Sequence, residues 1–441
     1  MKNYKKYIDD NKIDSRDAVI NLINSNPDDL ELEFLSVIAE TVNNKRTDTA
    51  AFYTDSSILN CIKERLPEIN KESVRILEPS VGIGNFLPII IEKYAHNSEL
   101  IIDVVDIDKK SLQILKALNK YRVIPDNVKI NYLNENFLDI SNSIKYDLVI
   151  GNPPFINLKI DDGLKEYRLR FNDDSNKNIA VFFLLNSLKR SRFVFLVMPK
   201  YLLHNEEFRN VRNTIKKRKI STIIDFGETG FKGVLIETIA ILIDNDNLPN
   251  MTNVISIQKE KSIVQPQKYI TCSRYPTWII YRNDFFDEVA GRMNFDVFTV
   301  FRDRQITNKD LYDDGEIRVL RSRNIKRDGT GILDILDYDR YTNHDKVERY
   351  SSYKFLDNDR VFLCPNMTYY PRVIRKPKNV LVNGSIAVLQ PNNDNDFNES
   401  KLKYFSTKEF EEFYRIARNH STRSLNLDNN SIFYFGLIEE D

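Results

Sequence analysis

Four residues at positions 152–155, Asn-Pro-Pro-Phe, follow a hydrophobic run and include no nucleophile, acid or metal ligand. Pro153 and Pro154 lack backbone N–H donors and hold φ near about −65°, so carbonyl oxygens are the polar groups that remain. The side-chain carbonyl of Asn152 and the backbone carbonyl of Pro153 would accept hydrogen bonds, and Phe155 would offer a flat face. Two acceptors beside an aromatic ring suit a planar substrate with an exocyclic –NH₂ group, whose lone pair they would direct at an electrophile.

A second candidate site joins an apolar run at 74–77 to a helical segment through EPSVGIG (78–84). Gly82 and Gly84 permit a tight turn and a close approach of the backbone to a ligand. A dinucleotide-binding loop has a third glycine, but Phe86-Leu87 stand near its place, so no pyrophosphate is expected. The alternative is an ordinary strand–helix turn.

An acid, Asp106, ends the next apolar run at VVDID (104–108). A carboxylate at this place accepts hydrogen bonds from both hydroxyls of a ribose. Taken alone, Asp106 would equally well cap the helix that follows. Together with the glycine loop, it predicts an adenosine pocket at the carboxyl edge of a sheet.

The elements that must position these residues are short apolar runs that alternate with helix-like segments, such as 108–121 and 178–190. Such a pattern predicts an α/β fold with a mostly parallel sheet covered by helices on both faces. The runs lie at 74–77, 100–107, 128–133, 146–150, 192–198, 221–226 and 238–243.

Different patterns flank this region. Residues 1–45 read as helical, with Asn26-Pro27 expected to begin a helix. Beyond about residue 245 the sequence predicts a separate, mainly β domain with one helix near 407–419. Its expected strands include NVISIQ (253–258), TWIIYR (277–282), IRVLRSR (317–323) and NVLVNGSIAVLQP (379–391). The predicted domains are therefore 1–45, 46–245 and 246–441.

The composition excludes several classes of protein. Hydrophobic residues make up 41% and charged residues 29% of the 441 residues, as in globular proteins. Lys+Arg and Asp+Glu both total 64, which excludes a uniformly basic nucleic-acid binder but not local basic patches. Three cysteines without CxxC spacing and four histidines argue against a disulfide framework or a metal site and suit a reducing cytosol. No apolar run approaches the roughly 20 residues that span a bilayer.

Five segments, taken in order, resemble the motifs of gamma-class N6-adenine DNA methyltransferases of restriction–modification systems. The resemblance covers about residues 45–245 and implies a Rossmann-like methyltransferase domain with a mostly parallel seven-stranded sheet. It implies S-adenosylmethionine (SAM) as cofactor, double-stranded DNA as substrate and partner, a separate cognate restriction endonuclease, and a mixed, mainly β C-terminal target-recognition domain. The segments are FYTD (52–55), ILEPSVGIGNFL (76–87), VVDID (104–108), NENFLD (134–139) and DLVIGNPPF (147–155).

The resemblance also implies roles for single residues. Glu78 would approach the amino group of the cofactor, and Asp106 would hold its ribose. Asn136 stands where the family has an Asp that contacts the cofactor's adenine amino group, and its amide carbonyl would accept the same hydrogen bond. Asn152 and Pro153 would bind the target N6, with Phe155 stacked on the base. Further implied positions are Phe52, Thr54, Pro79, Gly82, Gly84, Ile107, Phe137 and Asn152 at the cofactor, and Pro154 in the catalytic loop.

A base inside a duplex cannot reach such a pocket, so the target must be flipped out. The family places a second aromatic residue against the flipped base, and Phe231 fits that position, with a buried core residue as the alternative. The C-terminal region holds basic clusters with interleaved aromatics, as phosphate contacts and base-edge readers require; solvated charged faces are the alternative. The predicted DNA-binding residues are Arg318, Arg321, Arg323, Lys326, Arg372, Arg375, Lys376 and Arg423.

Other reactions use similar loops. N4-cytosine methylation uses the same amine chemistry, and protein-glutamine methylation also uses an NPP loop but does not require a large basic, aromatic C-terminal half. C5-cytosine methylation needs a cysteine on the active-site loop, and the nearest candidate, Cys364, lies in the other predicted domain. A DNA-binding specificity module that has lost activity remains the alternative outside enzymes. No nuclease signature is found, so a fused nuclease is not expected.

Overall fold

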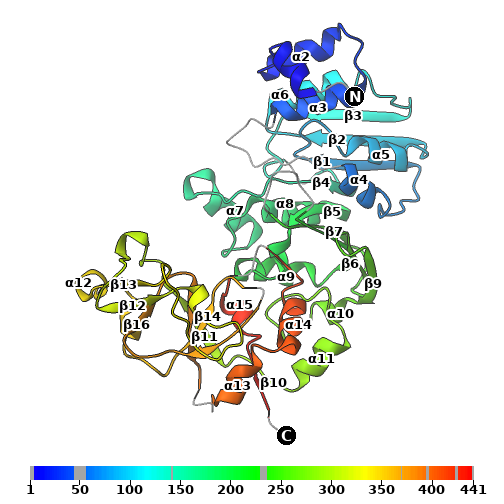
Figure 1. Cartoon of the computed structure of the whole chain (residues 1–441). Helices are drawn as coiled ribbons and strands as arrows, with labels where there is room; N and C mark the ends of the chain where they lie inside the picture. The colour runs from blue at the N-terminus through cyan, green and yellow to red at the C-terminus, as the bar shows by residue number, and fades with distance from the viewer. Residues whose placement is uncertain are drawn as a thin grey trace. The chain divides into compact units, whose positions relative to one another are not determined.

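The computed structural model describes residues 4–43, 56–140, 143–228, 236–368, 370–393, 397–422 and 426–439. The chain divides into two compact units (Figure 1). The first unit comprises residues 1–202 and 207–268, and the second comprises residues 203–206 and 269–441. Over the described part of the chain, no helix is long and apolar enough to cross a membrane.

The first unit is built on a sheet whose described strands follow the order β3-β2-β1-β4-β5-β7-β6-β8-β9. Neighbours are parallel except where β7 pairs with β5 and β6 and where β9 pairs with β8. The chain runs from β1 outward through β2 to β3 and then returns to β4 beside β1. Ligands of open α/β sheets bind at such a reversal, outside the carboxyl ends of the strands. The strands are β1 (Ser73–Pro79), β2 (Glu99–Val105), β3 (Val128–Leu133), β4 (Tyr146–Gly151), β5 (Ser191–Pro199), β6 (Lys219–Gly227), β7 (Thr238–Asp244), β8 (Met251–Ser256) and β9 (Lys261–Pro266).

Burial explains why the strands read as continuous apolar runs. Every residue of β4 and β7 is buried, as expected for strands covered on both faces. Helix α8 (Ile179–Leu188) is hydrophobic all round, and every residue after Ile179 is buried, which is typical of a helix inside a core. The α/β class and the seven predicted strands are confirmed. Other helices of this unit are α4 (Ser56–Lys63), α5 (Leu87–Tyr94), α6 (Lys109–Leu118), α7 (Leu164–Phe171) and α9 (Arg209–Ile215).

The N-terminal helices belong to the same unit. Helices α1 (Tyr4–Asp10), α2 (Arg16–Ser25) and α3 (Leu32–Asn43) form a hydrophobic cluster together with residues of α6 and the glycine loop. Figure 1 shows α2 and α3 beside α6. Residues 1–45 were expected to form a separate extension, but the apolar faces of α1, α2 and α3 share one hydrophobic cluster with α6.

The turn at Asn26-Pro27 ends a helix and does not begin one, so the expectation from the sequence is wrong here. Asn26 adopts a left-handed conformation (φ 35°, ψ 60°) as the C-cap of α2. Its side chain donates to the Leu30 carbonyl at 3.0 Å and accepts from the Leu30 N–H at 2.8 Å. An asparagine tolerates this conformation and satisfies the backbone locally, which stops the helix.

The sheet does not end at residue 245, where the sequence placed the domain boundary. Strand β8 pairs in parallel with β6, and β9 pairs with β8, so the described sheet has nine strands instead of seven. The first unit therefore extends to Lys268. Segment 277–282, an expected strand, is irregular. Its apolar residues are buried in the second unit without pairing, so burial alone made it resemble a strand.

The second unit contains small sheets around an aromatic core, in agreement with the predicted mixed, mainly β character. Its described sheets have the orders β11-β17-β14-β15, β13-β12-β16 and β10-β18. Stacked rings such as Phe286 and Phe413, 4.7 Å apart, fill the core. The strands are β10 (Met293–Asn294), β11 (Phe298–Arg302), β12 (Ile317–Leu320), β13 (Arg340–Thr342), β14 (Phe362–Pro365), β15 (Ile374–Arg375), β16 (Val380–Val382), β17 (Ile386–Pro391) and β18 (Leu437–Ile438). The helices include α11 (Asp284–Gly291), α12 (His344–Val347), α13 (Glu399–Tyr404), α14 (Lys408–Ala417) and α15 (Asn429–Ile432).

Candidate active site

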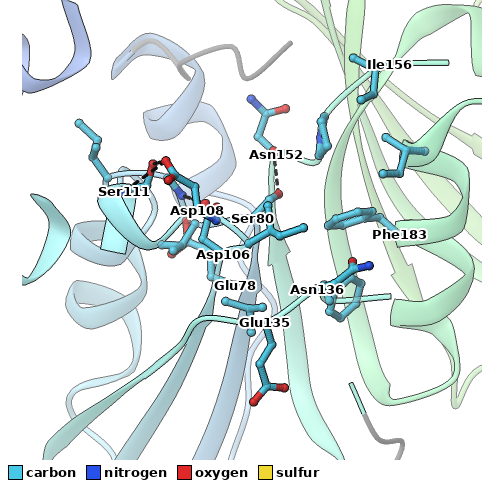
Figure 2. Close-up of a pocket in the computed structure, with 18 of the residues that line it drawn as sticks. Glu78, Ser80, Asp106, Asp108, Ser111, Glu135, Asn136, Asn152, Ile156 and Phe183 are labelled. Carbon is cyan, nitrogen blue, oxygen red and sulfur yellow. Dashed lines mark hydrogen bonds between the residues drawn. The ribbon is translucent and has the colours of Figure 1, made fainter. Parts of the chain in front are cut away.

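A cavity of about 360 Å³ opens at the carboxyl ends of β1, β2 and β4, where the strand order reverses. Figure 2 shows Asp106 and Asp108 on one side of Asn152, and Ile156 and Phe183 on the other. The motifs that lie within the described residues therefore meet at one place. The predicted residues that line the cavity are Glu78, Gly82, Asp106, Ile107, Asn136, Phe137, Asn152 and Pro154.

Other predicted site residues do not border the cavity or lie outside the described residues. Pro79, Gly84, Pro153 and Phe155 are next to lining residues but do not line the cavity themselves. Phe52, Thr54 and Phe231 lie outside the described residues. Their predicted roles stay predictions.

The two glycines of the loop between β1 and α5 have different surroundings, although both have positive φ (58° for Gly82 and 81° for Gly84). A Cβ on Gly82 would meet no described atom within 4 Å, and Gly82 lines the cavity. A Cβ on Gly84 would lie 2.5 Å from Leu115 of α6. Gly82 thus leaves room for a ligand, whereas Gly84 allows the loop to pack closely on α6.

Asp106 fixes the glycine loop to the end of β2. Its Oδ2 accepts from the Gly82 N–H at 2.8 Å, and its Oδ1 accepts from the Asp108 N–H at 2.8 Å. The N-cap of α6 is Asp108, which accepts from the Lys110 and Ser111 N–H groups. The helix-cap alternative for Asp106 is therefore excluded. Each carboxylate oxygen can accept more than one hydrogen bond.

Glu78 is a buried acid at the cavity wall. Burial raises the pKa of its carboxyl well above the ordinary value, while the charge of Arg122 and the Phe86 backbone N–H act in the opposite direction. Its Oε2 is buried and has no hydrogen-bond partner among the described residues. A buried carboxylate oxygen without a partner is costly, and a cationic hydrogen-bond donor on a ligand would satisfy it.

Asn136 and Phe137 follow β3 and shape the other part of the wall. The Asn136 amide donates to the Tyr167 hydroxyl at 2.9 Å, and its carbonyl accepts from the Leu138 N–H at 3.1 Å. One lone pair of that carbonyl is therefore engaged locally, and the second is left for a ligand. The Phe137 ring lies 5.0 Å from the Phe183 ring of α8, and both border the cavity.

The loop after β4 is held at both ends. The Ser80 hydroxyl lies 2.7 Å from the backbone carbonyl oxygen of Pro79 and 3.4 Å from the backbone carbonyl oxygen of Asn152, which ties the loop to β1. Beyond the prolines, the Ile179 N–H donates to the Ile156 carbonyl at 2.9 Å, which ties the loop to the start of α8. Phe155 is only 7% exposed and is part of the core. The structure thus fixes the Asn-Pro-Pro backbone, and Phe155 is buried and does not line the cavity.

The described cavity lining carries carboxylates and no lysine or arginine. Because phosphate groups would be repelled here and cations attracted, the charge agrees with the expectation that no pyrophosphate binds. Ile107, 72% exposed, also borders the cavity and offers an apolar surface at its rim. The lining acids are Glu78, Asp106, Asp108, Glu135 and Asp162.

The sequence missed several lining residues that come from other elements. Asn43, at the end of α3, lines the cavity and donates to the Ser111 hydroxyl at 3.3 Å. Close by, Arg16 of α2 pairs with Asp108 at 2.6 Å. No motif marks these residues, because the packing of the N-terminal helices on α6 brings them to the site.

The predicted DNA-binding residues of the second unit have unequal surroundings. Lys376 is 1% exposed, and its Nζ donates to the Leu356 and Pro377 carbonyls at 2.8 Å each. Burial lowers its pKa to about 8. Arg318 pairs with Asp334 at 2.6 Å and with Asp339 at 2.7 Å. The charges of these two residues are thus bound inside the unit, and a role for them in DNA binding stays a prediction.

Arg372 is also largely structural. Its guanidinium donates to the carbonyls of Tyr370, Ser322 and Ile325 at 3.0, 3.2 and 3.3 Å. Arg375 is exposed and donates to the Phe397 carbonyl at 3.2 Å. Of the other predicted DNA-binding residues, Arg321, Arg323 and Lys326 lie on the connection after β12, and Arg423 lies outside the described residues.

Comparisons with known proteins agree with this site. The family model described as Eco57I restriction-modification methylase matches residues 60–231, the region that holds the glycine loop, Asp106 and the Asn-Pro-Pro-Phe loop. The type II methyltransferase M.CvrRI of Paramecium bursaria Chlorella virus XZ-6E is 31% identical over 111 residues, which is 25% of this chain and 26% of that protein. The match thus spans about a quarter of the relative's length.

Two solved structures share the fold over most of the chain. The type IIL restriction-modification enzyme MmeI, solved in complex with DNA, has a TM-score of 0.55 at 13% identity, covering 95% of this chain and 67% of that chain. The type IIG restriction endonuclease BpuSI has a TM-score of 0.50 at 11% identity, covering 97% of this chain and 61% of that chain. At these identities the similarity shows a common fold.

Proposed function

We propose, on the premise that residues 60–231 form a restriction-modification methylase domain of the Eco57I kind, that this chain is a DNA methyltransferase. It would transfer a methyl group from SAM to N6 of an adenine flipped out of double-stranded DNA. The observation that carries the proposal is the acidic cavity bordered by Asn152 of the Asn-Pro-Pro-Phe loop. The kind of domain also favours a cognate restriction endonuclease as a functional partner.

The residues at the cavity fit SAM better than a phosphate-bearing cofactor. SAM carries a sulfonium and an ammonium and no phosphate, which suits a lining with acids and no described cation. Glu78 would bind the ammonium through its buried oxygen, Asp106 would accept from the ribose hydroxyls, and Ile107 would contact the adenine face. When bound, the cofactor supplies an electrophilic methyl group.

The Asn-Pro-Pro-Phe loop would prepare the target amine. An adenine amino group is a weak nucleophile because its lone pair is delocalised into the ring. The carbonyls of Asn152 and Pro153 would accept hydrogen bonds from its two hydrogens, which favours a pyramidal nitrogen with the lone pair free to attack. Positioning and electrostatics therefore replace a strong base, and the surplus proton would leave to solvent after transfer.

Base flipping would need a rearrangement at the loop. Phe155 was predicted to stack on the target base, but the ring is part of the core in this structure. Stacking would therefore require the ring to become accessible from the cavity when DNA binds, and catalytic contacts often tighten only in the complex. The proposed second stacking residue, Phe231, lies outside the described residues.

Methyl-labelled SAM distinguishes this function from its alternatives. The purified chain is incubated with labelled SAM and with DNA of mixed sequence, and label is counted separately in nucleic acid and in protein. The proposal predicts label in DNA that depends on Asn152. Label in protein alone would favour glutamine methylation. Binding of SAM without transfer to any DNA would favour a specificity module that has lost activity.

A further inference from the structure

The connection between β12 and β13 in the second unit is unusually long. It runs over residues 321–339, although β12 and β13 are antiparallel neighbours in the same sheet. The connection contains a short 3-10 helix at Ser322–Asn324 and a bridged hairpin, so it is an ordered part of the unit. We refer to residues 321–339 as the arginine loop, because it contains Arg321, Arg323 and Arg327.

The arginine loop is fixed from inside the unit. Asp339 accepts from Arg318 at 2.7 Å and from the Asn324 amide at 2.6 Å, so both ends of the loop are joined to one carboxylate. The tip is a hairpin in which Ile325 bridges to Ile332 and the Lys326 N–H donates to the Gly331 carbonyl at 2.9 Å. A loop with this many internal bonds presents its side chains in a defined arrangement.

Arginines of the loop stack on tyrosine rings. The Arg321 and Arg323 guanidiniums lie 3.8 and 4.8 Å from the ring centre of Tyr338. Arg327 lies 3.9 Å from the ring centre of Tyr370, on a neighbouring segment. Stacking on an aromatic face holds a guanidinium flat and leaves its N–H edge free to donate.

Two of these arginines differ from the others in having no polar partner. Arg323 and Arg327 are exposed, and neither makes a hydrogen bond or ion pair with a described residue. Arg321 instead donates to the Tyr338 carbonyl, and Arg372, close to the tip, donates to backbone carbonyls. Burial, and to a smaller extent the nearby charge of Arg327, lowers the pKa of Arg372. The guanidinium groups of Arg323 and Arg327 are therefore available to a ligand, although the four basic residues of the loop are matched in number by four aspartates.

Apolar side chains are exposed around the same arginines. Leu336 of the loop is 92% exposed, and Met367, near Tyr370, is 62% exposed. The major groove offers both base edges and thymine methyl groups, which guanidiniums and apolar side chains can contact.

We propose that Arg323 and Arg327 are specificity-determining residues that read guanines in the major groove of the target DNA, each through the N–H edge of a guanidinium held by a tyrosine. A guanidinium donates in a fork to O6 and N7 of guanine, which is the commonest specific contact of this kind. This inference rests on the proposed function, since it assigns the sequence-reading step of the same enzyme.

Lysine substitutions separate base reading from charge. Arg323→Lys and Arg327→Lys keep the positive charge and lose the planar fork. The matched control is Arg360→Lys, since Arg360 is an exposed arginine of the same unit with no aromatic contact. Each full-length variant modifies the same DNA library, and long-read sequencing then gives the modified motif with its rate at every sequence. The salt dependence of DNA binding is measured in parallel.

The expected result is a motif that relaxes at a guanine position in Arg323→Lys and in Arg327→Lys. The preference for guanine at that position should fall roughly 5- to 100-fold, while the salt dependence of DNA binding stays unchanged. Arg360→Lys should keep the wild-type motif. An unchanged motif in both loop variants would overturn the inference. Arg323→Ala and Arg327→Ala give a second test. If they lower the methylation rate equally at all sequences and reduce the slope of log affinity against log salt concentration, the two arginines contact phosphates and the inference is overturned. If the wild-type chain modifies no DNA, the proposed function fails and the inference fails with it.

Discussion

The cofactor edge of the first unit and the arginine loop of the second unit both follow strands, yet their residues obtain their roles in different ways. At the cofactor edge, Asp106 and Asn152 stand at the carboxyl ends of β2 and β4, where a parallel sheet brings polar groups together. In the second unit, Arg318 and Arg323 lie five positions apart in the same basic stretch. One is bound by two carboxylates, and the other is exposed on a tyrosine ring.

The two regions differ in how much the sequence reveals about the role of a charged or polar residue. A role set by strand topology can be read from order and spacing, because the sheet fixes where the strand ends meet. The role of an arginine depends on whether a carboxylate from another segment neutralises it, which spacing does not reveal. Substitutions at the two regions should therefore have different signatures.

The largest effect is expected for Asn152→Ala at the cofactor edge. It removes one of two acceptors at the target amine and should reduce single-turnover methyl transfer by roughly 2–4 kcal/mol, about 30- to 1,000-fold, by analogy with a lost oxyanion-hole donor. SAM affinity should change little. The control is Asn157→Ala, an exposed asparagine in the same loop that does not line the cavity. Equal rates for the two variants would remove Asn152 from the mechanism.

Asp106→Ala should act on binding first. Hydrogen bonds to a charged group contribute about 1.5–3 kcal/mol, so the dissociation constant of SAM should rise about 10- to 150-fold. The substitution also releases the Gly82 N–H from its acceptor, which loosens the loop. Calorimetry gives the affinity, and turnover at saturating SAM should recover most of the wild-type rate. An unchanged affinity would show that the ribose lies elsewhere.

Arg318→Ala tests whether the Arg318 side chain stabilises the folded second unit. Loss of the bond to Asp339 leaves a largely buried carboxylate with fewer donors and should lower the free energy of unfolding by about 2 kcal/mol. Arg323→Ala should change it by less than about 0.5 kcal/mol, as at ordinary surface positions. Chemical denaturation of both variants measures the difference. A stable Arg318→Ala variant with altered DNA recognition would reverse the assigned roles.

The smallest effect is expected for the proton that Glu78 should release when SAM binds. Burial raises the pKa of this carboxyl in the folded state. Its contribution to stability is therefore present below the pKa of the unfolded state and is lost as pH rises through the folded-state pKa. A ligand ammonium favours the charged form, so SAM binding should release a proton and become tighter as pH rises toward that pKa. Calorimetry in two buffers with different ionisation enthalpies measures the release. Glu78→Gln should abolish it, and wild-type release in that variant would place the ammonium elsewhere.

Much of the first unit could be predicted from the sequence, because buried parallel strands leave continuous apolar runs. The missed parts depend on distant packing. Strand β8 has too few apolar residues to reveal that it continues the sheet, and Asn43 reaches the cavity because α3 packs against α6. Lys376 was taken for a DNA contact within a basic run, but carbonyls of a folded segment surround it. The patterns therefore predicted which described residues gather at the cavity, but not which basic residues are bound inside the second unit.

We propose methylation of adenine N6 at the edge formed by the glycine loop, Asp106 and the Asn-Pro-Pro-Phe loop. Nucleoside analysis by mass spectrometry tests this directly, on DNA that has been incubated with SAM and either the wild-type chain or Asn152→Ala. We expect N6-methyldeoxyadenosine with the wild-type chain and its near absence with the variant at equal SAM occupancy. N4-methyldeoxycytidine as the product, or equal yields of N6-methyldeoxyadenosine from both proteins, would contradict it.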